Sequence, residues 1–250
     1  MKQSVKLIAG NWKMNGLAAD LNAVVQDLKL ALHEEPAQCR VAICPPATLI
    51  HRMADLLGGS SVEVGGQDCR AEETGAYTGD LSAEMLADAG ATLVILGHSE
   101  RRAGYGETDA LVSAKVGAAL RAGLEPIVCV GETLAEREMR KTLDVVTTQV
   151  RDSLPPFLEG QAFAIAYEPV WAIGSGLTPT LDQIEEVHAA IRATLREMFG
   201  QGGAAAPILY GGSVKPSNAA DILKAGEVGG ALVGGASLKA RDFLTIIEAA

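Results

Sequence analysis

Short apolar segments recur along the chain, and each of them is bounded by residues that favour turns. The segments are Val5–Ala9, Val41–Cys44, Val62–Val64, Ala91–Leu96, Pro126–Val130, Ala162–Ala166, Ile208–Tyr210 and Ala231–Val233. Several are apolar at every position, which is typical of parallel strands whose two faces are both covered. The pattern predicts eight buried strands, and Val62–Val64 is the weakest of them because it contains Glu63.

Between these segments, apolar residues recur at helical spacing. The three clearest stripes are Leu17, Leu21, Val24, Val25, Leu28 and Leu32; Met139, Leu143, Val146 and Val150; and Leu181, Ile184, Val187, Ile191, Leu195 and Met198. A capping box, Thr180-x-x-Gln183, opens the third. The repeated alternation predicts an α/β fold, a single (β/α)8 TIM barrel of residues 1–250 with a closed parallel eight-stranded sheet. A doubly wound open sheet is the alternative, and the absence of an early GxGxxG disfavours it.

Composition narrows the functional classes. The formal net charge of −10 argues against a nucleic-acid partner and against an anionic membrane surface, since both need a basic footprint. We expect neither a signal peptide nor a membrane span. The four cysteines form no CxxC pair, so we expect reduced thiols and no bound metal. The chain is therefore expected to be a cytoplasmic enzyme or binding protein.

In a parallel barrel, functional side chains gather where the strands end, at the carboxyl face. Asn11 and Lys13 follow the first predicted strand, where a turn residue and a solvated lysine are the structural alternatives. His98 follows the fourth, and the next residues can begin a helical turn whose amides face its ring. Such amides disfavour the imidazolium form, because the accepting nitrogen must keep its lone pair. A helix-capping histidine is the structural alternative.

Glu168 ends the sixth predicted strand and begins an apolar loop. Desolvation of a carboxylate favours proton uptake, which suits a general base, whereas a salt-bridged structural glutamate is the alternative. The following segment combines Pro169, Trp171 and two glycines, a composition that suits a hinged lid over a ligand. The last two strands end in Gly211-Gly212-Ser213 and Gly234-Gly235. Backbone amides there, with helices expected from Ser217 and near Ser237, predict a phosphate site.

Taken together, these segments resemble the triosephosphate isomerase family over the whole chain. The resemblance is carried by GNWKMN (10–15), LGHSERR (96–102), VCVGE (128–132), AYEPVWAIGSG (166–176), YGGSVKP (210–216) and GALVGGASL (230–238). It implies an aldose–ketose isomerase that interconverts dihydroxyacetone phosphate and D-glyceraldehyde 3-phosphate without metal or cofactor. A different phosphosugar isomerase or epimerase, or a non-catalytic phosphate-binding barrel, are the alternatives, and neither requires His98 and Glu168 together.

The resemblance also implies residue roles. Glu168 would be the base, His98 a neutral electrophile, and Lys13 a positive charge near the substrate. The implied substrate-binding residues are Asn11, Lys13, Gly174, Ser213, Gly234 and Gly235. The implied lid consists of Pro169, Val170, Trp171, Ala172, Ile173, Gly174, Ser175, Gly176, Leu177, Thr178 and Pro179.

A homodimer is implied by the segment 75–80, in which Tyr77, Thr78 and Gly79 would enter the second subunit. Gln67, Glu100 and Glu107 occupy positions that support the site or the interface, and Cys129 is expected to pack behind the base. One departure concerns the lid. Leu177-Thr178-Pro179 stands where the family usually has Lys-Thr-Ala, and Pro179 removes a backbone donor from that hinge.

Overall fold

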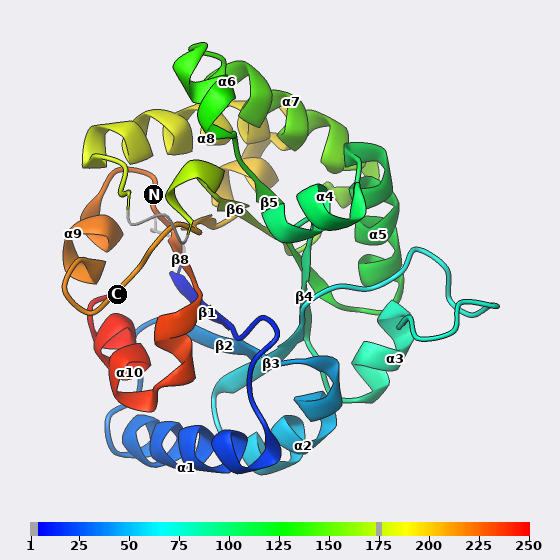
Figure 1. The fold of residues 1–250 in the computed structure, drawn as a ribbon, viewed down its shortest axis with the longest axis vertical. Helices are drawn as coiled ribbons and strands as arrows, with labels where there is room; N and C mark the ends of the chain where they lie inside the picture. Colours follow the sequence, from blue (N-terminus) through cyan, green and yellow to red (C-terminus); the bar gives the residue numbers. More distant parts are fainter. Residues whose placement is uncertain (1–4, 174–176) are drawn as a thin grey trace.

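A computed structural model describes residues 5–173 and 177–250, and within them parallel strands close into a barrel in sequence order, β1 to β8 (Figure 1). The strands are β1 (Leu7–Asn11), β2 (Arg40–Cys44), β3 (Val62–Gly66), β4 (Leu93–Leu96), β5 (Glu125–Val130), β6 (Ala164–Tyr167), β7 (Ile208–Tyr210) and β8 (Gly230–Val233). All eight coincide with predicted strands, with ends shifted by up to two residues. The predicted closed parallel sheet is confirmed.

Helices surround the barrel, as Figure 1 shows. They are α1 (Ala18–Glu34), α2 (Ala47–Leu57), α3 (Ala83–Asp88), α4 (Ser99–Tyr105), α5 (Asp109–Arg121), α6 (Leu134–Glu138), α7 (Thr142–Ser153), α8 (Leu181–Ala205), α9 (Ala219–Lys224) and α10 (Ala240–Glu248). Single 3₁₀ turns are η1 (Pro156–Leu158), η2 (Val170–Ala172) and η3 (Gly235–Leu238). No helix in the described ranges is long and apolar enough to cross a membrane.

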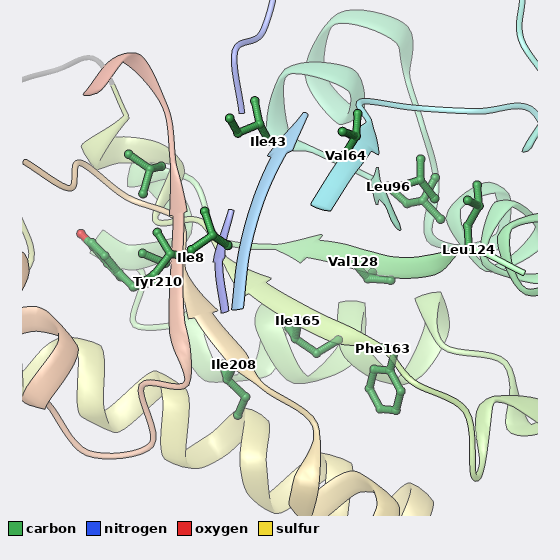
Figure 2. Close-up of a cluster of buried hydrophobic side chains, with 14 of the residues drawn as sticks. Ile8, Ile43, Val64, Leu96, Leu124, Val128, Phe163, Ile165, Ile208 and Tyr210 are labelled. Carbon is green, nitrogen blue, oxygen red and sulfur yellow. The ribbon is translucent and has the colours of Figure 1, made fainter. Parts of the chain in front are cut away.

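Alternation along the strands separates two apolar layers. One set fills the barrel interior: Leu7, Ala9, Ala42, Cys44, Leu93, Ile95, Ile127, Cys129, Ala164, Ala166, Leu209 and Leu232. The other set packs against the helices, and Figure 2 labels ten of its members, from Ile8 on β1 to Tyr210 on β7. Both faces of the sheet are thus buried, which explains why the strands are apolar at nearly every position.

The charged residue that made β3 the weakest predicted strand has a partner inside the barrel. Glu63 accepts two hydrogen bonds from the guanidinium of Arg40, at 2.9 Å each. Glu125 accepts two more from the same guanidinium, at 2.7 and 3.1 Å. The alternation along β3 therefore puts Val62 and Val64 against the helices and Glu63 in an ionic cluster at the amino end of the barrel.

Of two helical predictions, one is confirmed and the other is partly wrong. The capping box of α8 is confirmed, since Thr180 N and Gln183 N each donate to the other residue's side chain. The predicted stripe from Met139 to Val150 is partly wrong, because Met139 is 57% exposed and Leu143 is 37% exposed. Arg140, with a φ of 58°, separates α6 from α7, and the break turns the first half of that stripe toward solvent.

Closure of the barrel depends on one glycine. Gly230 pairs with Leu7 across the β1–β8 seam and has a φ of +144°. A Cβ atom at this position would overlap the backbone carbonyl of Leu7. The seam therefore requires a residue without a side chain at the start of β8.

We predict that Gly230→Ala lowers the free energy of unfolding by at least about 3 kcal/mol, because the backbone of β1 cannot yield to the added methyl group. Gly123→Ala is the matched control: its φ is +76°, but nothing lies within 4 Å of the added Cβ. The control should cost only about 1 kcal/mol of backbone strain. Urea unfolding of both variants measures the difference, and equal losses would contradict the seam argument.

Candidate active site

The carboxyl ends of the strands surround a cavity of about 400 Å³. It is lined by Asn11, Lys13, Asn15, His98, Glu168, Ile173, Gly211, Gly212, Ser213, Val214, Lys215, Leu232, Gly234, Gly235 and Ala236. The structure thus brings together the predicted catalytic and substrate-binding residues, except Gly174, which lies outside the described residues. A larger hollow of about 930 Å³ lies around Lys6 and Arg192 at the amino end, and none of the predicted site residues lines it.

Glu168 is held rigidly at the end of β6. Its backbone N donates to the carbonyl of Val130 at 2.7 Å, and its side chain is buried. Two glycines on the neighbouring strand ends make room for it. A Cβ at Gly131 would overlap the backbone of Glu168, and one at Gly211 would lie 2.9 Å from Glu168 Cγ. The strand ends therefore close tightly around the carboxylate.

Both oxygens of that carboxylate are bonded to the β4–α4 junction. Oε1 lies 2.8 Å from Nε2 of His98, and Oε2 accepts a hydrogen bond from the backbone N of Ser99 at 2.9 Å. These contacts come from a strand two positions away in the barrel. Among the contacts of the described residues, Glu168 pairs with no arginine or lysine, and its ionic neighbour is the imidazole of His98.

His98 sits at the N-terminus of α4, where the amide of Glu100 donates to its Nδ1 at 3.2 Å. The predicted helical turn is confirmed, with one amide facing the ring, and His98 also occupies the helix-capping position that was its structural alternative. A nitrogen that accepts from an amide carries no proton, so this network assigns the ring proton to Nε2, which donates to Glu168. The exposed carboxylate of Glu100 lies 3.6 Å from Nδ1, beyond hydrogen-bond distance, so the amide determines the tautomer.

Lys13 adopts a left-handed backbone conformation with a φ of 53°. Asn11 Oδ1 accepts from its backbone N at 3.0 Å, and Gln67 Nε2 donates to its carbonyl at 2.9 Å. Its Nζ lies 2.6 Å from Oε1 of Glu100. These contacts stabilise an otherwise unfavourable conformation and place the ammonium group at the cavity wall. Gln67 and Glu100, which were expected to support the site or the interface, thus contact Lys13.

The first half of the predicted lid is anchored to Glu132, a residue to which the sequence analysis assigned no role. This buried carboxylate accepts hydrogen bonds from Trp171 Nε1 at 2.8 Å, Arg137 at 3.0 Å and the hydroxyl of Tyr167 at 3.2 Å. The Arg137 guanidinium also lies 4.8 Å from the centre of the Trp171 ring. Its position in the sequence could have indicated a role, since Glu132 follows the fifth strand as Glu168 follows the sixth.

Of the remaining lid, residues 174–176 lie outside the described residues. Leu177 and Thr178 are exposed, whereas Pro179 is buried at the start of α8. Ser213 is joined to the lid base, because its hydroxyl donates to the carbonyl of Ala172 at 3.3 Å. The second hinge therefore contains a buried proline that offers no backbone donor.

The two glycine turns follow the neighbouring strands β7 and β8 and form another part of the cavity wall. No atom lies within 4 Å of a Cβ built at Gly235, so this backbone faces open space. The helices expected beside the turns differ from the prediction: α9 begins at Ala219 rather than Ser217, and the segment around Ser237 is the 3₁₀ turn η3. Lys215 also lines the cavity and was missed, although it lies close to the end of a strand.

Cys129 lies in the barrel interior, where its thiol is fully buried. Burial, and secondly the nearby Glu168 carboxylate, raise the pKa of the Cys129 thiol well above its usual value. The expected packing position behind Glu168 is therefore observed. Within residues 5–173 and 177–250, no group of three or more His, Cys, Asp or Glu side chains is placed to hold a metal ion.

Comparison with known proteins gives a consistent family. The triosephosphate isomerase family model matches residues 6–250. A triosephosphate isomerase of Caulobacter vibrioides is 60% identical over 243 residues, which cover 97% of this chain and 96% of that protein. One of Ruegeria sp. is 58% identical and covers 98% of this chain and 97% of its own. The crystal structure of triosephosphate isomerase from Bartonella henselae superposes with a TM-score of 0.91 at 50% identity, covering 98% of both chains.

We predict that thiol reagents at pH 8 modify Cys39 before the other three cysteines, because Cys39 is only half-buried. Burial raises the pKa of Cys69 to about 12 and raises the pKa values of Cys44 and Cys129 further, so few thiolates exist at pH 8. Mass spectrometry of the labelled native protein, with a urea-unfolded sample as control, gives the order. Early modification of Cys129 would contradict it.

Proposed function

Because this chain belongs to the triosephosphate isomerase family, we propose that Glu168, His98 and Lys13 perform its reaction in the cavity at the carboxyl end of the barrel. The chain is an isomerase of glycolysis that interconverts dihydroxyacetone phosphate and D-glyceraldehyde 3-phosphate. The roles of the individual residues are the proposal, and the contact between Glu168 and His98 supports it most directly.

That contact joins a carboxylate to a neutral imidazole at the wall of a cavity. The two groups are 2.8 Å apart, and the side chains are 2% and 7% exposed. An ordinary structural pair of this kind would lie away from solvent and ligands, whereas this one shares its cavity with Lys13 and two glycine turns. Base, donor and anion site in one cavity are the parts needed to move a proton next to a carbonyl group.

The reaction follows from these groups. The substrate oxygen takes the place of the Glu168 carboxylate as the acceptor of the His98 Nε2 proton. Glu168 then removes a proton from the carbon next to the carbonyl, and an enediolate forms. The same carboxyl returns that proton to the neighbouring carbon. The hydroxyl proton moves from the oxygen of the first carbon to the oxygen of the second, and the two transfers together convert the ketose to the aldose. Oriented donors in a water-poor cavity stabilise the developing charge, and removing one such donor typically costs about 3 to 4 kcal/mol.

Lys13 and the glycine turns bind the anionic parts of the substrate. Their place in the same cavity as Glu168 supports a phosphate on the backbone amides of Ser213, Gly234 and Gly235. A lid over the cavity would exclude water, which protects the enediolate phosphate from elimination. The anchoring of Trp171 to Glu132 would hold the lid base in one of its positions, and closure would exchange these bonds.

A second part of the proposal is a homodimer. The segment 71–80 projects from the barrel beside α3 (Figure 1), and residues 73–81 are all exposed. Tyr77 in this segment is 40% exposed, and Met14, next to Lys13, is 97% exposed. Exposed apolar groups around a site favour an interface. Thr78 would then contact Asn11 and Lys13 of the partner subunit.

Free cysteines without a CxxC motif support a location in the cytoplasm.

We predict that Glu168→Asp lowers kcat by about 100-fold with little change in KM, since the carboxylate is withdrawn from the reacting carbon by one methylene group. The exposed Glu159→Asp is the matched control and should keep both constants. Steady-state kinetics on D-glyceraldehyde 3-phosphate measures the effect. An unchanged kcat in Glu168→Asp would exclude this residue as the base.

We also predict that Thr78→Arg converts the protein to monomers and lowers kcat, because a long cation cannot fit a contact built for a small hydroxyl next to Lys13 of the partner subunit. Thr148→Arg, on the exposed face of α7, is the control and should remain dimeric. Sedimentation over a range of concentrations gives the association state. Wild-type protein that stays monomeric at all concentrations would refute the dimer without touching the role of Glu168.

A further inference from the structure

Two loops of the cavity that are far apart in sequence are joined by one side chain. The loop 10–17 follows β1, and the turn 234–238 follows β8, and these strands are neighbours at the barrel seam. Trp12 lies between them with 1% of its surface exposed. Its indole Nε1 donates a hydrogen bond to the backbone carbonyl of Ser237 at 3.2 Å.

Trp12 is anchored firmly on its own side. Its backbone N donates to the carbonyl of Cys44 at the end of β2, at 3.1 Å. Its carbonyl accepts from Asn15 Nδ2 at 2.8 Å. The ring also packs over Gly16, where a Cβ would lie 2.8 Å from the indole carbons. With backbone and ring both fixed, the position of the indole N–H is set by the end of the sheet.

The turn that receives this bond has a definite internal geometry. The backbone N and the hydroxyl of Ser237 both donate to the carbonyl of Gly234, at 2.8 and 2.7 Å. That carbonyl belongs to the same peptide unit as the N–H of Gly235. A trans peptide is planar, and its C=O and N–H point in opposite directions. Since Ser237 is fully buried and Gly235 lines the cavity, fixing the carbonyl toward Ser237 aims the N–H of Gly235 at the cavity.

The close approach of the turn to β1 is also built in. A Cβ at Gly10 would lie 2.8 Å from the Cβ of Ser237, so glycine allows the turn to sit directly against the strand. A Cβ at Gly234 would lie 3.9 Å from Cε of Lys13, which follows Trp12 in the chain. Trp12, Ser237 and Gly234 thus form a chain of contacts that begins next to Lys13 and ends at the Gly235 amide.

We propose that Trp12 is a positioning residue for substrate phosphate, acting through Ser237 to hold the Gly235 N–H in the direction that binds the anion. This inference rests on the proposed role of the turn 234–235 as the phosphate site. It assigns a function to an indole N–H that would otherwise be one more satisfied donor in the core. Trp12 itself touches neither the reacting carbon nor the phosphate.

The test uses Trp12→Phe in the full-length protein, which keeps an apolar ring and removes the donor. The carbonyl of Ser237 is left buried without its partner, so the turn should relax. We expect the inhibition constant of inorganic phosphate, and KM for D-glyceraldehyde 3-phosphate, to rise about tenfold. The kcat/KM for unphosphorylated D-glyceraldehyde should stay within about twofold, since this substrate does not use the turn.

Ser237→Ala provides a second approach to the same turn and removes only a buried hydroxyl. It should raise the phosphate inhibition constant with the same sparing of D-glyceraldehyde, because the carbonyl of Gly234 loses one of its two donors. If Trp12→Phe fails to fold, an unchanged constant in Ser237→Ala still overturns the proposal, because Ser237 would then not hold the Gly235 N–H. Phe199→Leu, a buried ring in α8 far from the mouth, is the control for a general loss of packing. This control should lower Tm without changing the phosphate inhibition constant.

The proposal is overturned if Ser237→Ala and folded Trp12→Phe bind phosphate as the wild type does. It is also overturned if turnover of D-glyceraldehyde falls as much as that of the phosphorylated substrate, because the indole would then act on Lys13 or Glu168 instead. If the turn 234–235 is not the phosphate site, phosphate will not compete with substrate in the wild-type protein. That result refutes the proposed function of the turn itself, before any variant is compared.

Discussion

The closed pairing of eight parallel strands is the constraint on which the rest of this molecule depends. Parallel pairing brings all carboxyl ends to one face, so residues separated by most of the chain meet there. The seam between β1 and β8 is the last link in that ring, and it closes only because Gly230 adds no side chain against Leu7. Asn11 and Gly234 face the same cavity as a direct result.

The site also shows how an acidic protein can bind an anion. The chain carries a net charge of −10, yet the cavity wall combines Lys13 and Lys215 with the backbone amides of the glycine turns. On the proposed roles, local donors outweigh the overall field because distant carboxylates are screened by solvent and salt. The carboxylate of Glu168 within the same cavity is compensated by two hydrogen-bond donors.

Much of the fold could be predicted from the sequence, since an uninterrupted apolar strand between amphipathic helices has few other solutions. Glu63 made the prediction of one strand weaker, because its partner, Arg40, lies on a different strand and the pairing cannot be read from the sequence. The stripe through Met139 failed since periodicity does not register a break such as the left-handed Arg140. Glu168 and His98 could be located by their places after strands. Glu132 also follows a strand, but its contact with the lid at Trp171, like the contact of Trp12 with Ser237, is created only by the folded chain.

The bond between His98 and Glu168 has a consequence for selectivity. In the structure each of these groups satisfies the other, so separating them has a free-energy cost that an incoming molecule must offset. On the proposed roles, a ligand that offers only a phosphate binds at the glycine turns and leaves the contact between His98 and Glu168 intact. A ligand with a carbonyl oxygen at the right distance gives His98 a new acceptor and releases the carboxylate. On the proposed roles, the base becomes available only to molecules that carry the group it acts on.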